Sequence, residues 1–64
     1  MWTVIFITCN NSTVQKIRQL FKTREIMVRV RRVNENGESG CYEVMVPYAE
    51  VSAAQDIIIE EEFN

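Results

Sequence analysis

The 64-residue sequence contains no histidine, one proline, two glycines and two cysteines. Without histidine there is no imidazole to serve as a general base near neutral pH. Two thiols are too few for a secreted disulfide framework, and they cannot close a four-ligand zinc site by themselves. The carboxylates of Glu25 and Glu43 have no visible partner, and no serine has the company of a triad. We therefore expect no enzyme activity, no cofactor and no bound metal.

Long hydrophobic runs are also missing. No apolar stretch approaches the roughly 18 residues of a membrane span, and no basic stretch precedes the first apolar residues as in a signal peptide. We therefore expect a cytoplasmic protein with no membrane association. The length allows one domain, residues 1–64, whose small core gains from a partner.

Charge is unevenly distributed although the net charge is only −2. Residues 1–34 carry all seven basic groups and one acid, Glu25, whereas residues 35–64 carry eight acids and no base. The asymmetry has two interpretations: neighbouring elements of opposite sign that pair locally, or a polar molecule that docks a partner with one end.

Residues 2–8, "WTVIFIT", are uncharged and rich in β-branched and aromatic types, which predicts a strand. Ser12 to Gln15 then match a capping box, with Ser12 as the capping residue of a helix that runs to about Arg24. Apolar residues recur at helical spacing on one side of it, which predicts the buried face: Val14, Ile17, Leu20 and Phe21.

Residues 26–33 and 41–46 alternate with period two, which predicts two strands joined around "NGESG". A two-residue Asn36-Gly37 turn would place arginines on the apolar face, so the paired residue numbers must sum to 72 or 74. The second sum pairs Arg31 with Glu43. We therefore expect a wider loop with a bulge near Gly40 instead of a ligand-binding loop.

Pro47 is suited to open a second helix, in which Val51, Ala54 and Ile58 form the buried stripe. The stretch "DIIIEEEF" leaves an alternative, since three consecutive isoleucines also favour a fourth strand. The order of elements predicts an α+β fold, a split βαβ unit of βαββα type. It is ferredoxin-like without the last strand, with sheet order 2-3-1 and both helices on one face.

The opening strand, the Asn10-Asn11 break, the amphipathic helix and "EVMVP" together resemble a family of small bacterial proteins. Its members are described as signal-transducing proteins related to nitrogen-regulatory PII-like domains, and as a domain of unknown function. The resemblance implies a βαββα fold and a regulatory or binding role. Some similar chains are named glutamate decarboxylase, but a pyridoxal enzyme needs a large pocket that this chain cannot build. The long nucleotide-binding loop of PII proteins is also missing.

The open face of the sheet is the candidate binding surface. If Ile5 and Ile7 face the helices, apolar and basic residues gather on the other side, as at protein interfaces: Trp2, Val4, Phe6, Met27, Arg29, Arg31 and Met45. The reverse facing would bury the aromatic residues. A protein partner is the first hypothesis, and RNA bound by the arginines and strand-one aromatics is the alternative. The pI of about 5.0 counts against nucleic acid.

Two further expectations concern the end and the edge of the first strand. Cys9 and Cys41 should be close neighbours and, in a reducing cytoplasm, free thiols. Arg29, Arg31 and Arg32 guard one sheet edge, but the first strand has no charge, proline or glycine to prevent pairing. We therefore expect a homodimer through residues 2–8, unless residues 57–62 cover that edge.

Overall fold

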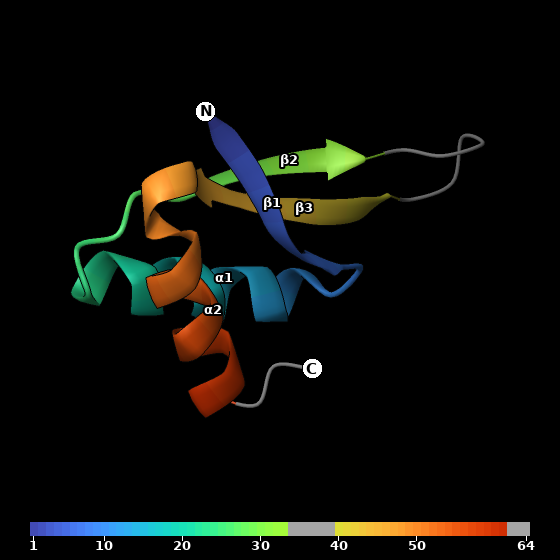
Figure 1. The fold of residues 1–64 in the computed structure, drawn as a ribbon. Helices are drawn as coiled ribbons and strands as arrows, with labels where there is room; N and C mark the ends of the chain where they lie inside the picture. Colours follow the sequence, from blue (N-terminus) through green and yellow to red (C-terminus); the bar gives the residue numbers. More distant parts are fainter. Residues whose placement is uncertain (34–39, 62–64) are drawn as a thin grey trace.

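The structure is a computed structural model that describes residues 1–33 and 40–61. It contains strand β1 (Trp2–Thr8), helix α1 (Asn11–Thr23), strands β2 (Arg29–Val33) and β3 (Cys41–Pro47), a short 3₁₀ turn η1 (Tyr48–Glu50) and helix α2 (Val51–Glu60). The three strands form one antiparallel-paired sheet in the order β1-β3-β2, and both helices lie on the same side of it (Figure 1). The predicted α+β fold and strand order are confirmed. None of the helices in the described part of the chain is long and apolar enough to cross a membrane.

The core lies between the sheet and the helices. Its fully buried side chains come from three elements, Ile17 and Phe21 of α1, Val44 and Val46 of β3, and Ala54 of α2. Ile57 and Ile58 of α2 complete it, which corrects the fourth-strand alternative for residues 57–60. Residue 62 lies outside the described residues.

The register between β2 and β3 follows the alternation of the sequence. Val30 lies opposite Val44 and Arg31 opposite Glu43, so the paired numbers sum to 74, one of the two predicted values. Val44 is buried and Arg31 is exposed, as period two requires. The predicted Asn36-Gly37 loop falls outside the described residues.

The capping residue of helix α1 lies two positions earlier than the sequence suggested. The side chain of Asn10, not of Ser12, accepts hydrogen bonds from the backbone amides of Ser12 (2.8 Å) and Thr13 (3.3 Å). Asn10 has an extended backbone, and a short Oδ1 reaches the N2 and N3 amides from there. The predicted Ser12 capping box is therefore wrong, because Ser12 already lies inside the helix.

This cap can be tested by alanine substitution. We expect Asn10→Ala to lower the free energy of unfolding by about 1 kcal/mol, because two helix amides lose their acceptor. Ser12→Ala is the matched control and should change it by less than about 0.5 kcal/mol. Urea denaturation followed by circular dichroism measures both. A larger loss for Ser12→Ala than for Asn10→Ala would return the cap to Ser12.

The other end of α1 turns the chain back toward the core. Glu25 has a left-handed backbone (φ 58°), and its amide donates to the Lys22 carbonyl at 3.1 Å. The Ile26 amide donates to the Phe21 carbonyl at 2.9 Å, which completes a Schellman motif. This reversal buries Ile26 directly after an exposed helix end.

Cys9 and Cys41 form a disulfide. The predicted proximity is confirmed: Thr8 of β1 pairs with Tyr42 of β3, so the next residues along the two antiparallel strands meet. The expectation of two free thiols is corrected, since the described chain has no free cysteine. The bond ties the end of β1 to the start of β3 across 32 positions of the sequence.

Candidate interaction site on the open sheet face

A β-bulge in β1 decides which of its side chains face away from the helices. The register with β3 runs Trp2–Pro47, Thr3–Val46 and Val4–Met45, and then resumes at Phe6–Val44, so Ile5 is the extra residue. Past this point the inward and outward positions of β1 exchange.

Two predicted facings are wrong for this reason. Phe6 lies opposite the fully buried Val44 and packs against the core instead of the open face. Ile7 lies opposite Glu43 and is 61% exposed, instead of facing the helices. Trp2 and Val4, before the bulge, lie on the open face as predicted.

Trp2 and Arg29 lie together across the central strand. The guanidinium carbon of Arg29 is 5.0 Å from the Trp2 ring centroid, within the range of a cation–π contact. Met45 of β3 pairs with Val4 on one side and with Arg29 on the other. Met45 is only 7% exposed although it points away from the helices, because these neighbours surround it. The open face thus has a small apolar centre of its own.

Arg31 is held by a carboxylate on the neighbouring strand. Its Nε donates to Oε1 of Glu43 at 3.0 Å, and its Nη2 donates to the same oxygen. The pair follows from the register, which sets the two residues directly opposite each other. Since Glu43 is thereby engaged, it does not neutralise the other arginines of β2.

A hollow of about 650 Å³ lies over this part of the sheet. It has an apolar floor and a basic rim, and its lining residues are Trp2, Val4, Arg29, Val30, Arg31, Arg32 and Met45. Among the described residues, no carboxylate forms an ion pair with Arg29 or Arg32. We call this feature the arginine hollow.

The structure brings five of the seven predicted site residues together in the arginine hollow: Trp2, Val4, Arg29, Arg31 and Met45. Met27 is 65% exposed but lies in the segment before β2. Phe6 is on the other face, and Ile7 replaces it on the open side. Sequence reasoning placed Arg32 at the edge but not in the site. The exposure of Ile7 could not be predicted from the sequence. It depends on the bulge, and an uncharged strand with apolar residues on both sides contains no pattern that predicts a bulge.

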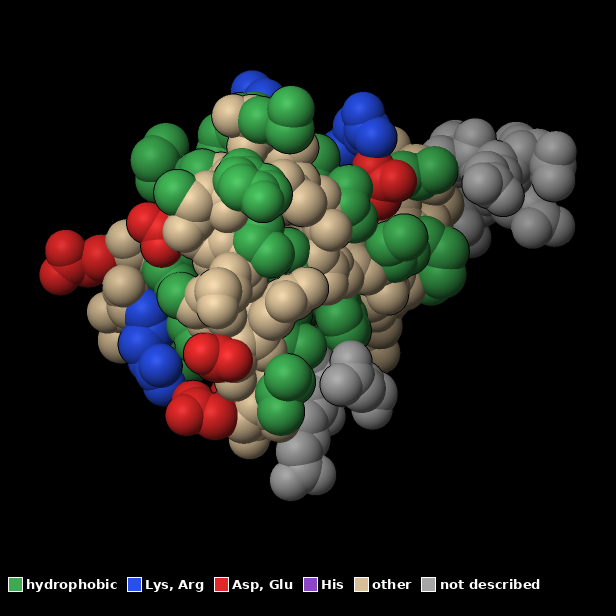
Figure 2. Space-filling view, viewed as in Figure 1, with side chains coloured by type: hydrophobic (Ala, Val, Ile, Leu, Met, Phe, Trp, Pro, Cys, Tyr) green, Lys and Arg blue, Asp and Glu red, His purple; other side chains and the backbone are tan. Residues whose placement is uncertain are grey.

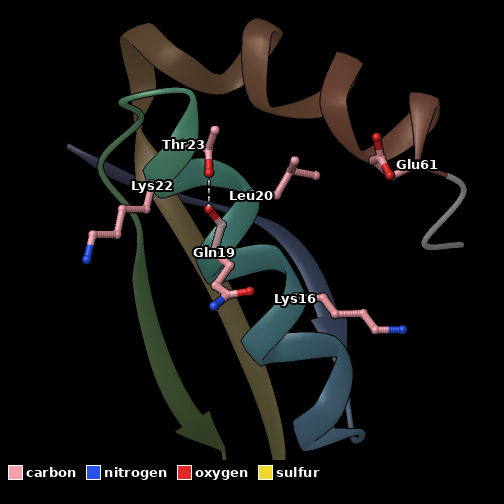
Figure 3. Close-up of a pocket in the computed structure, with 6 residues that line it drawn as sticks. All are labelled: Lys16, Gln19, Leu20, Lys22, Thr23 and Glu61. Atoms are coloured by element: carbon pink, nitrogen blue, oxygen red, sulfur yellow. Dashed lines mark hydrogen bonds between the residues drawn. The ribbon is translucent and has the colours of Figure 1, made fainter.

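A second hollow, of about 550 Å³, lies between α1 and the end of α2. Figure 3 shows that the side chains of Lys16 and Lys22 extend away from each other, while Leu20 lies between the helices. The hydroxyl of Thr23 donates to the Gln19 carbonyl at 3.0 Å within α1. The polar groups diverge, so this hollow does not assemble a site for one small ligand.

A third hollow is bordered by carboxylates and by Arg24, which lies 3.7 Å from Glu60. In Figure 2 acidic side chains lie over the lower part of α2 with a basic group beside them, and at the upper right another basic group lies against an acidic one. Within residues 1–33 and 40–61, no group of three or more acidic or cysteine side chains is arranged to hold a metal ion. The Arg24–Glu60 pair joins the basic half of the sequence to the acidic half, so elements of opposite sign pair locally here, which was the first interpretation of the charge asymmetry.

No protein-family model, curated protein or solved structure matches this chain. The resemblance to small signal-transducing proteins therefore stays a prediction, and the open sheet face is the feature of this chain that bears on its function.

Proposed function

We propose that this chain is a small non-enzymatic interaction domain. It binds a protein, in the first instance a second copy of itself, through the edge of β1 and the adjoining open sheet face. The observation that carries the proposal is the exposure of large apolar side chains on one continuous side of the sheet, namely Trp2, Val4 and Ile7. Contiguous apolar patches on small domains usually mark an interaction site.

The two sheet edges differ in a way that favours β1. The β2 edge carries Arg29, Arg31 and Arg32, and such charges commonly prevent strands from pairing with another chain. β1 carries no charged residue. In the three-stranded sheet it is hydrogen-bonded to β3 on one side, so its other side is an outer edge of that sheet. Two copies that pair β1 antiparallel would form one continuous sheet about a two-fold axis. The small core gains stability from such a partner by mass action.

A charge placed on β1 tests this proposal. We expect the wild-type chain to associate with increasing concentration in analytical ultracentrifugation, and Ile7→Lys to weaken the association about tenfold or more, since each copy contributes the change. Ile7 is exposed, so the substituted monomer should still fold. Gln15→Lys on the exposed side of α1 is the matched control. A wild-type chain that stays monomeric at high micromolar concentration, with Ile7→Lys unchanged, would reject the dimer.

RNA is the second candidate, supported by the three arginines around an exposed tryptophan. Two observations weaken it: Phe6 is not part of the platform, and the Trp2 ring already packs against Arg29. The cytoplasmic location inferred from the sequence stays a prediction, and the Cys9–Cys41 disulfide weighs against it, because such bonds persist mainly in oxidising compartments.

A further inference from the structure

The arginine hollow combines features that fit one kind of peptide. Arg29 and Arg32 at its rim have no carboxylate partner among the described residues, and Met45, Trp2 and Val4 form an apolar floor. A ligand that satisfies both parts must bring carboxylates to the rim and an apolar or aromatic side chain to the floor.

This chain contains such a segment. Residues 61–64 read Glu-Glu-Phe-Asn, of which only Glu61 belongs to the described residues. Glu61 is exposed and forms no ion pair with a described residue, whereas Glu60 already lies beside Arg24. Glu61 to Phe63 therefore match the hollow in charge and in composition, since they offer carboxylates to the rim and an aromatic ring to the floor.

A chain cannot fill its own hollow in this way. Helix α2 packs on the face of the sheet opposite the one that carries Trp2 and Met45, and Glu61 lines the hollow beside α1 (Figures 1 and 3). The four residues from Glu61 to Asn64 reach about 13 Å at most when extended. That reach is too short to pass the helix layer and the edge of the sheet, so the occupant must come from a second copy.

We propose that the arginine hollow binds the acidic segment 61–64 of a second copy of this chain. The carboxylates of Glu61 and Glu62 meet Arg29 and Arg32, and Phe63 packs against Trp2 and Met45. The contact rests on the open-face interaction proposed above and shares Trp2 and Val4 with that surface, but it does not require the β1 strands of two copies to pair. It is a head-to-tail contact, which in repetition builds a ring or an open chain of copies instead of a closed two-fold pair.

Trp2 is the only tryptophan, so its fluorescence reports directly on the hollow. The probe is a capped synthetic peptide with the sequence of residues 58–64, added to the wild-type chain at low micromolar concentration. We expect a saturable change in Trp2 emission with half-saturation at about 0.1–1 mM, because exposed charge pairs are individually weak. Raising the salt concentration should weaken the binding. A peptide with glutamine in place of the three glutamates should bind about tenfold more weakly.

Two double variants of the full chain complete the test. Arg29→Gln with Arg32→Gln should weaken peptide binding about tenfold, because the rim loses both charges. Lys16→Gln with Lys22→Gln removes the same charge from α1, near Glu61, and should leave binding unchanged. Circular dichroism checks that each variant is folded.

Three results would overturn the proposal: no change in Trp2 emission at several millimolar peptide, equal binding of the glutamine peptide, or loss of binding in the lysine variant alone. A response of Trp2 to oligouridine but not to the peptide would instead assign the hollow to RNA. The β1 proposal is tested separately, since Ile7 does not line the hollow and Ile7→Lys should leave peptide binding intact. Association lost in Ile7→Lys without any peptide binding would reject only the hollow, and the converse would reject only the β1 edge.

Discussion

Phe21→Ala is expected to lower the free energy of unfolding by about 3–5 kcal/mol, enough to leave much of the protein unfolded at 25 °C. The Phe21 ring is completely buried and belongs to the core cluster with Val44 and Ala54. Its truncation removes apolar burial and leaves a cavity that a small core cannot fill. A domain of this length has a total stability of roughly 3–10 kcal/mol, so the loss is of the same size as the whole.

Urea denaturation followed by circular dichroism measures this effect. Gln19→Ala is the matched control, because Gln19 is exposed on the same helix and its change should stay within about 0.5 kcal/mol. Phe21→Leu should fall between the two, since it keeps most of the buried apolar volume. A Phe21→Ala protein that unfolds at the same urea concentration as the wild type would contradict the central place of this ring.

Removing the disulfide is the second change with a large expected effect. Cys9→Ser with Cys41→Ser should lower the free energy of unfolding by roughly 3–4 kcal/mol, because the bond closes a loop of about 33 residues that the unfolded chain otherwise explores. For a domain whose core is limited by its length, such a bond supplies a large part of the total stability.

Thermal unfolding with and without a reducing agent measures the contribution. Reduction should lower the melting temperature of the wild type to that of the double serine variant. The variant itself should not respond to the reductant, which controls for effects of the reagent on the rest of the protein. Equal melting temperatures for the oxidised wild type and the double variant would show that the bond does not stabilise the fold.

Much of the fold was readable because it depends on local and periodic features. The alternation around Val28, Val30 and Val44 determined which faces of two strands are buried and restricted the register to two values. The heptad-like spacing of Val14, Ile17 and Phe21 determined the buried side of α1. The direction and order of the strands followed from the crossover and the hairpin, since few topologies satisfy both. The sequence did not predict which of several neighbouring polar side chains caps α1. Asn10 and Ser12 can both accept hydrogen bonds from backbone amides, and in the structure Asn10 does so.

The open sheet face shows most clearly what the sequence determined and what only the tertiary structure decided. By itself the sequence determined that Met27, Arg29 and Arg31 share one side of their strand, and it left open whether Trp2 and Val4 join them on that side of the sheet. Only the tertiary structure decided that Phe6 belongs to the core and Ile7 to the surface. The physical reason is the bulge at Ile5, which exchanges inward and outward positions, and an uncharged strand that is apolar on both sides allows this because either set of side chains can be buried. The strand order predicted that Cys9 and Cys41 lie close together, but only the tertiary structure decided that they form a disulfide and that Trp2 lies against Arg29, because both contacts join segments distant in the sequence.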